Sequence, residues 1–177
     1  MFGDLGAAIV DADEATHAVY APGTRGFDAI VQEFGREYVR QGQIDRKRLG
    51  DLVFRDDGAR LRLNAIVHPL VRDWMAERTV EAAEHGEDVV MHDVPLIFEN
   101  QLQGLFDATV LVFAKPSTQL ERLGARGVPR DRAQGMLAAQ MPIDDKRKLA
   151  DFVIDNEGLL EDTRRQVVEV WTRVRSL

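Results

Sequence analysis

The sequence predicts an α/β protein built on a parallel sheet, and two observations lead to that fold class. Four short apolar runs occur at residues 7–10, 89–94, 109–114 and, more weakly, 152–154. Each is nearly continuous, as in strands that are buried on both faces of a parallel sheet. Between these runs lie segments with apolar residues at three- and four-residue spacing, which is typical of helices. Strands that alternate with helices favour a parallel sheet.

The helical periodicity predicts helices over residues 26–34, 46–54, 59–83 and 159–174, and another that begins after Pro116 with Ser117 as its N-cap. The pair His68-Pro69 lies inside the longest of these patterns. Because proline lacks a backbone N–H, we expect a kink or a junction between two helices there, with His68 facing inward or into a cleft.

Length and composition indicate one domain spanning residues 1–177. The net charge of −7 argues against a nucleic-acid-binding protein, because such affinity comes from basic residues. No apolar run is long enough to span a bilayer, and the first residues do not have the pattern of a signal peptide. With no cysteine in the chain, we expect a soluble cytoplasmic protein without membrane partners; the oligomeric state is open.

Polar residues follow the predicted strands where a parallel sheet places its ligands, in the crevice beyond the carboxyl ends. Asp11 and Asp13 follow the first run, Pro95 and Glu99 the second, and Asp155 and Asn156 the last. If the extended conformation persists, the carboxylates of Asp11 and Asp13 point the same way and can accept a proton from a hydroxyl or hold a metal ion through water. Alternatively, Asp13 caps a helix over residues 14–20 and Asp11 is a solvated turn residue.

Arginines predict a phosphate-binding surface further along the chain. Arg122 and Arg126 are four residues apart on one predicted helix, where two guanidinium groups on one face can grip a polyphosphate. The alternative for the surrounding charges is a solvated helix surface. The basic segment also contains Arg130, Arg132, Lys146, Arg147 and Lys148.

Two further residues have a structural and a functional interpretation each. His68 is either a structural histidine or a ligand contact, and Asn156 either forms a turn or reads the edge of a base with its carboxamide. No Ser/His/Asp arrangement and no pair of histidines with metal-ligand spacing is evident, so no metal-ligating residue is assigned.

The order of these segments resembles that of one enzyme family. The segments are Leu5–Asp13, Pro22-Gly23, Phe34-Gly35, Asp45-Arg46 with Leu49, Leu63–Pro69, Val94–Glu99, Gln119–Leu123 with Arg126, Ala139-Gln140, Lys146 and Ala150–Asn156. Together they closely resemble dephospho-CoA kinase over essentially the whole chain.

The resemblance implies a P-loop kinase fold with a helical substrate-binding region at about residues 26–83 and a lid at about 117–148. It implies transfer of the γ-phosphoryl group of ATP, with Mg²⁺, to the ribose 3′-hydroxyl of dephospho-CoA, the last step of coenzyme A synthesis. Asp13 would be the base or orienting group, supported by Asp11. The other implied contacts are His68, Pro69 and Glu99 to the substrate, Arg122, Arg126 and Lys146 to phosphate in the lid, and Asn156 to adenine.

The chain departs from the family at its first residues. Members begin with an apolar strand and a phosphate loop that ends in Gly-Lys-Ser/Thr, and no such segment occurs in these 177 residues. We therefore expect a sheet that lacks its first, central strand and, at most, feeble turnover by this chain as written. A start assigned too late in an active kinase is one interpretation. The alternative is a non-catalytic remnant that binds dephospho-CoA or a protein partner.

Overall fold

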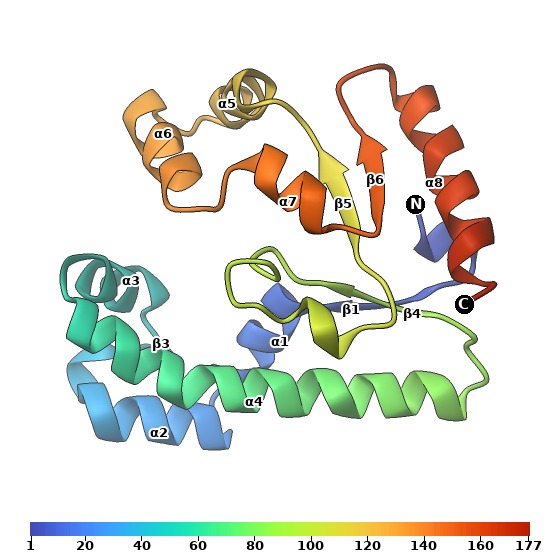
Figure 1. Cartoon of the computed structure of the whole chain (residues 1–177). Helices are drawn as coiled ribbons and strands as arrows, with labels where there is room; N and C mark the ends of the chain where they lie inside the picture. Colours follow the sequence, from blue (N-terminus) through green and yellow to red (C-terminus); the bar gives the residue numbers. More distant parts are fainter. The chain divides into compact units, whose positions relative to one another are not determined.

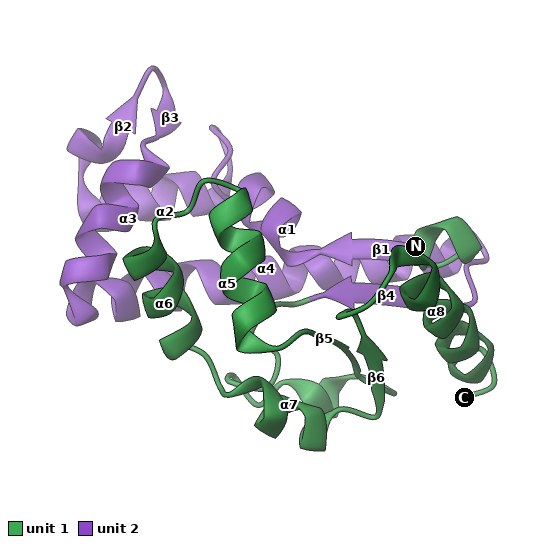
Figure 2. Ribbon diagram, turned by 90° about the horizontal axis from the view of Figure 1, so that it is seen from above, with its two compact units in different colours: residues 1–7, 94–177 green, residues 8–93 purple.

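The computed structural model describes all 177 residues, which form two compact units. Unit 2 comprises residues 8–93, and unit 1 comprises residues 1–7 together with 94–177 (Figure 2). Each unit contains one pair of parallel strands, as the apolar runs predicted. The expectation of a single domain over the whole chain stays a prediction.

Unit 2 is built on two parallel strands, β1 (Ala8–Asp11) and β4 (Val90–Asp93). Their register pairs Ala8 with Val90 and Asp11 with Asp93, so both strands end in an aspartate at the same edge. A short antiparallel hairpin, β2 (Val39–Arg40) with β3 (Gln43–Ile44), was not predicted. The elements of unit 2 between β1 and β4 are α1 (Ala12–Val19), α2 (Arg25–Phe34), the 3₁₀ turn η2 (Arg36–Tyr38), the hairpin, α3 (Arg46–Arg55) and α4 (Asp57–Glu84), as Figure 1 shows.

Helix α4 runs without a break through Pro69, so the expected junction between two helices is wrong, whereas the alternative of a kink stays a prediction. Pro69 withholds one N–H from the helix ladder, but the turns on either side continue. His68 is exposed on this helix, so it does not face inward, and its position in a cleft stays a prediction. No helix of the structure combines the length and the apolar character that a bilayer span requires.

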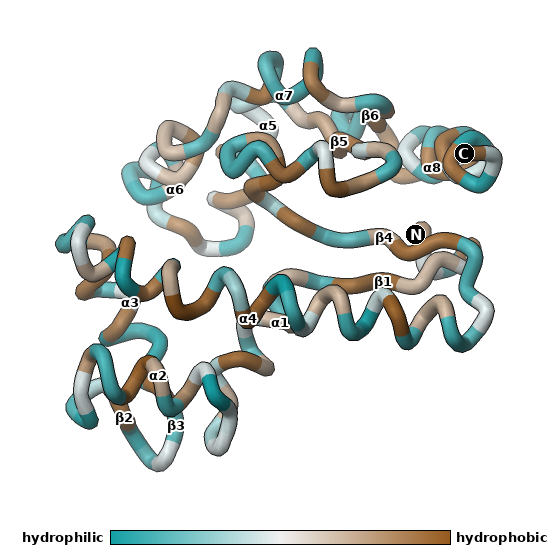
Figure 3. The backbone as a smooth tube through the Cα atoms, turned by 60° about the horizontal axis from the view of Figure 1, so that its bottom comes forward, coloured by the Kyte–Doolittle hydropathy of each residue, from teal (hydrophilic) through white to brown (hydrophobic).

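The core of unit 2 forms where α2, α3 and α4 meet. Ile30, Leu49 and Ala59, one from each of these helices, are fully buried there. Along α4, polar and apolar residues alternate in bands (Figure 3). Burial of each large aliphatic side chain contributes about 1.5–3 kcal/mol. This three-helix contact therefore fixes the helical part of unit 2.

Unit 1 contains the other parallel pair, β5 (Val110–Phe113) and β6 (Phe152–Asp155), which pairs Phe113 with Asp155 at its carboxyl end. Ile154 is fully buried, and α8 packs on this strand. The remaining elements of unit 1 are η1 (Gly3–Leu5), η3 (Gln103–Leu105), α5 (Pro116–Ala125), α6 (Arg130–Ala138), α7 (Ile143–Leu149) and α8 (Leu160–Val174).

The first residues of the chain belong to the core of unit 1. Phe2 and Leu5 pack against the buried cluster formed by β6 and α8, and the ring of Phe2 lies 6.4 Å from that of Trp171. This contact was not predicted, because residues 1–6 carry no periodic pattern of apolar residues.

Helix α5 (Pro116–Ala125) begins two residues earlier than predicted. Pro116 occupies its first turn and Lys115 is its N-cap residue, so the assignment of Ser117 as N-cap is wrong. Proline suits this position, because the missing N–H would have no partner in the helix.

Candidate functional site

The strand-end aspartates of unit 2 have different surroundings. Asp11 ends β1 and caps α1, since its Oδ1 accepts hydrogen bonds from the backbone N–H groups of Asp13 (2.7 Å) and Glu14 (3.4 Å). The chain turns directly into the helix at Ala12, so the extended conformation does not persist to Asp13 and the two carboxylates do not share a strand face. The cap is also Asp11, not Asp13 as the structural alternative held.

Asp13 is exposed in the first turn of α1, and its side chain forms no hydrogen bond or ion pair. A carboxylate at this position benefits from the positive end of the helix dipole. Asp13 is therefore the aspartate of this pair whose carboxylate has no partner within the chain, and its role toward a substrate stays a prediction.

Asp93, at the end of β4, is the carboxylate that sequence reasoning missed. Burial raises its pKa, and the neighbouring charges of Asp11 and Asp13 raise it further. Asp11 and Asp93 are paired residues at one edge of β1 and β4, and Asp13 follows Asp11 in the first turn of α1. The signal was present in the sequence, since Asp93 ends an apolar run just as Asp11 does.

The far end of α1 contacts the start of α3. Arg46 Nη1 lies 2.6 Å from the ring nitrogens of His17, and its guanidinium group lies over the ring of Tyr20, 5.3 Å from the centroid. Burial raises the pKa of Tyr20, although the charge of Arg46 opposes this. Through these two contacts of Arg46, the helix that carries Asp13 is attached to α3.

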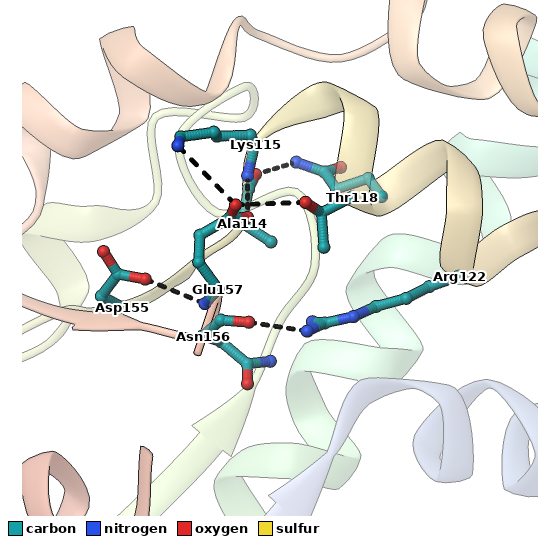
Figure 4. Close-up of polar contacts among 8 residues, drawn as sticks. Ala114, Lys115, Thr118, Arg122, Asp155, Asn156 and Glu157 are labelled. Carbon is teal, nitrogen blue, oxygen red and sulfur yellow. Dashed lines mark hydrogen bonds and ion pairs between the residues drawn. The ribbon is translucent and has the colours of Figure 1, made fainter. Parts of the chain in front are cut away.

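A polar network lies at the carboxyl ends of β5 and β6 in unit 1 (Figure 4). Arg122 is half-buried on α5, and its Nη2 donates a hydrogen bond to the backbone oxygen of Asn156 at 2.7 Å. The Asn156 side-chain oxygen accepts from the Thr163 hydroxyl at 3.1 Å, which leaves the amide nitrogen to face other partners. The structure thus brings Arg122 and Asn156 together.

The side chain of Arg126 takes no part in the hydrogen bond that connects Arg122 with Asn156. Helix α5 ends at Ala125, and Arg126 is the exposed residue that terminates it. The predicted pair of guanidinium groups on one helix face therefore includes one residue at the helix end, whose side chain does not make the contact that Arg122 makes with Asn156.

Glu157 holds the start of α5. Its Oε1 accepts from the Lys115 backbone N–H at 2.6 Å, and its Oε2 accepts from the Thr118 hydroxyl at 3.1 Å. Asp155 accepts in turn from the Glu157 N–H at 2.9 Å (Figure 4). A carboxylate here satisfies N–H groups that a helix start leaves without partners.

Glu99 and Lys146 form an ion pair within unit 1, with Lys146 Nζ 2.7 Å from Glu99 Oε1. Burial would raise the pKa of Glu99, but hydrogen bonds from Lys146 and from the Met141 N–H outweigh it and hold that pKa below its usual value. Glu99 Oε2 is buried without a hydrogen-bond partner. The two residues that the resemblance assigned to substrate and phosphate therefore bind each other.

Pairs of parallel strands that end in carboxylates, with helices between the strands, define the class of protein: an α/β protein consistent with a P-loop kinase-like fold. The sequence shows which family. The sequence model of the dephospho-CoA kinase family matches residues 1–162. The chain belongs to this family.

Several relatives support the assignment. The chain is 42% identical to the dephospho-CoA kinase of Frankia casuarinae over 94% of its own length and 72% of the relative's. It is 44% identical to that of Streptomyces avermitilis over 94% and 81% of the two chains, and 41% identical to that of Listeria monocytogenes over 95% and 85%. The chain is thus, by family, a kinase.

Solved structures agree on the fold. A protein from Thermus thermophilus superimposes with a TM-score of 0.82 at 30% identity, over 98% of this chain and 87% of that one. Dephospho-CoA kinase from Campylobacter jejuni superimposes with a TM-score of 0.70 over 98% and 88%; at 24% identity it supports the fold alone.

Proposed function

We propose that this chain contributes the acceptor-side and arginine-bearing residues for transfer of the γ-phosphoryl group of ATP to the ribose 3′-hydroxyl of dephospho-CoA. The observation that carries the proposal is the division of roles between two aspartates. Asp11 is committed to capping α1, whereas the Asp13 carboxylate has no partner in the chain. A carboxylate in the first helical turn after a strand end, without an internal partner, is suited to hold a substrate hydroxyl.

In the proposed reaction, Asp13 accepts a hydrogen bond from the 3′-hydroxyl and takes its proton as the oxygen bonds to the γ-phosphorus. The bond from that phosphorus to the β,γ-bridging oxygen breaks, and ADP leaves with the electron pair. Asp11 supports the geometry by fixing the first turn of α1 through the Asp13 N–H. Such a reaction needs alignment and charge neutralisation more than covalent help from the protein.

The carboxylates of unit 2 fit a magnesium ion of the kind that kinases use. Mg²⁺ keeps several waters and is bound by one or two carboxylates together with substrate phosphates. Asp13 and Asp93 would hold such an ion through its water ligands, since both side chains are exposed and no group of three metal-binding side chains occurs in the chain. When bound, the ion neutralises phosphate charge.

Unit 1 supplies the proposed contacts to ATP. Arg122 uses one nitrogen for Asn156 and retains other N–H donors for phosphate oxygens. Arg126, exposed at the end of α5, is a second proposed phosphate contact. With its oxygen bonded to Thr163, Asn156 has an amide N–H₂ to donate to an acceptor nitrogen of adenine.

The exposed residues His68 and Pro69 on α4 are the proposed contacts to dephospho-CoA.

The chain contains no cysteine, which is compatible with a protein that functions in the reducing cytoplasm; this location stays a prediction. We propose that residues 1–177 form one dephospho-CoA kinase-like domain, with the acceptor bound by about residues 26–83 and a lid at about 117–148.

A direct test measures conversion of dephospho-CoA to CoA with ATP, by mass spectrometry of the product. Because these 177 residues contain no Gly-x-x-x-x-Gly-Lys-Ser/Thr segment, we expect feeble turnover by this polypeptide alone and full turnover when a strand and such a loop are joined to its N-terminus. Equal activity of both forms would contradict the proposed impairment. If neither form turns over but both bind dephospho-CoA, the chain is a non-catalytic binding protein.

A further inference from the structure

Lys146 is the one charged residue of the chain that is buried, with 5% of its surface exposed. Its ammonium group contacts Glu99 Oε1 at 2.7 Å and donates to Gln140 Oε1 at 3.2 Å. An ammonium ion out of water is stable only when it is paired and hydrogen-bonded. The charge of Lys146 is therefore committed inside unit 1.

The same carboxylate also holds the backbone. Glu99 Oε1 accepts a hydrogen bond from the Met141 N–H at 3.0 Å. Residues 139–142 connect α6 to α7, so Glu99, which lies 42 residues earlier in the chain than Met141, fixes the point where α6 ends.

The opposite end of this helical segment is held in the same way. We call residues 116–138 the arm; it consists of α5, α6 and the turn between them, and it carries Arg122 and Arg126. Glu157 accepts from the N–H of Lys115 just before the arm (Figure 4), and Glu99 accepts from the N–H of Met141 just after it. A carboxylate thus binds a backbone N–H at each end of the arm.

Helix α7, which follows the second of these contacts, is anchored on its strand. Arg147 follows Lys146 in the sequence. Its guanidinium group lies 5.0 Å from the ring centroid of Phe113 in β5. Together, these contacts attach α7 to β5 and to the segment that contains Glu99, so the Glu99–Lys146 pair lies where the chain passes from the arm to the helix anchored on β5.

We propose that Glu99 and Lys146 are positioning residues, which set the placement of the arm and hence of its arginines, and that neither contacts substrate. This inference rests on the proposed function for its effect on turnover, but the anchoring of the arm does not depend on it. Direct binding of phosphate by Lys146 would require the pair to break and would leave the Glu99 carboxylate with backbone N–H donors only, those of Met141 and of Glu99 itself.

The two possibilities differ in a double-mutant cycle with Glu99→Gln and Lys146→Met. If the pair positions the arm, each single variant lowers the single-turnover rate by a similar factor, about 10- to 100-fold for a small misplacement of the reacting groups. The double variant then costs little more than either single variant, and the KM for dephospho-CoA changes by less than about threefold, because that substrate binds unit 2. Lys146→Arg, which retains the charge and the donors, restores most of the rate.

The matched control is Lys148→Met, which removes another lysine–carboxylate pair two residues further along α7. Lys148 Nζ lies 2.6 Å from Asp145 Oδ1, but both side chains are exposed. Exposed pairs contribute little, so this variant is expected to match the unaltered chain in every measurement.

Hydrogen exchange gives a readout that does not require catalysis. Faster amide exchange across residues 116–142 in Glu99→Gln and Lys146→Met, with residues 152–155 of β6 unchanged, is the expected result, and it stands even if the chain phosphorylates nothing. Unchanged exchange in the arm overturns the inference. A large loss of rate in Lys146→Met with a normal rate in Glu99→Gln also overturns it, since that pattern indicates direct contact of Lys146 with phosphate.

Discussion

Asp11 and Asp93 lie opposite one another at the carboxyl ends of β1 and β4, as paired residues of two parallel strands. Asp11 has its charge partly satisfied by two backbone N–H groups at the start of α1. Asp93 has a raised pKa, which is caused first by burial and then by the charges of Asp11 and Asp13. The edge of this strand pair therefore concentrates negative charge that a magnesium ion or a substrate hydroxyl can relieve.

The raised pKa of Asp93 predicts a pH dependence of stability. The folded chain binds this proton more tightly than the unfolded chain, so the stabilising contribution is present below the ordinary pKa of 3.8 and is lost as pH rises through the higher folded value. Asp93→Asn is thus expected to raise the free energy of unfolding at neutral pH, with no gain below the ordinary pKa.

Urea unfolding at a series of pH values measures this difference. Asp73→Asn, on the exposed side of α4, is the control and is expected to show no such pH-dependent gain. A loss of stability in Asp93→Asn at neutral pH would show that the Asp93 charge is satisfied by the folded chain, contrary to the account.

The cap on α1 predicts a different outcome at Asp11. Asp11→Ala removes the acceptor for the Asp13 and Glu14 N–H groups, and the loss of such a cap costs about 1 kcal/mol. Asp11→Asn retains an acceptor oxygen and is expected to be close to the unaltered chain. Chemical denaturation compares the two variants; equal loss in both would mean that the charge, not the cap, is what stabilises the helix.

Arg122 tests the proposed ATP contacts. Arg122→Ala is expected to lower kcat/KM for ATP by about 10- to 100-fold, the range for losing hydrogen bonds to a charged group, with little change in KM for dephospho-CoA. Steady-state kinetics with each substrate varied measures this. Arg132→Ala, exposed on α6, serves as the control, and a similar loss there would point to general charge rather than to the position of Arg122.

Asp151 joins the starts of β5 and β6. Its carboxylate accepts from the N–H and the hydroxyl of buried Thr109, both at 2.8 Å, and these bonds lower the pKa of Asp151. Asp151→Ala is expected to destabilise the chain by about 1 kcal/mol at neutral pH. The lowered pKa means that this contribution is present above pH 3.8 and is lost as pH falls through the folded value, so the difference between the two proteins shrinks in acid. A difference that is constant with pH would exclude the carboxylate as its source.

Much of the fold follows from local patterns in the sequence. Continuous apolar runs located all four parallel strands to within a residue or two, and helical spacing located α2, α3, α4 and α8. The hairpin at residues 39–44 escaped prediction because each of its strands has two residues, too few for a period to show.

The site was less predictable, because its partners are far apart in the sequence. Spacing alone suggested a shared role for Asp11 and Asp13, but the helix begins at Ala12 and separates them. The contact between Arg122 and Asn156 spans 34 residues and that between Glu99 and Met141 spans 42, so only the fold reveals them. Family resemblance named the residues; it did not show that Glu99 and Lys146 bind each other.

The most direct test of the central claim is the rate of CoA formation by Asp13→Asn in the form of the chain that carries an N-terminal strand and phosphate loop. The Asp13 side chain forms no hydrogen bond or ion pair, so the variant is expected to fold, to lose only the small helix-dipole contribution to stability, and to bind both substrates. The account predicts a loss of about 10²- to 10⁴-fold in the rate of phosphoryl transfer, the usual contribution of a positioned acid or base. A rate within about threefold of the parent, in a folded variant, would contradict the assignment of Asp13 to the hydroxyl.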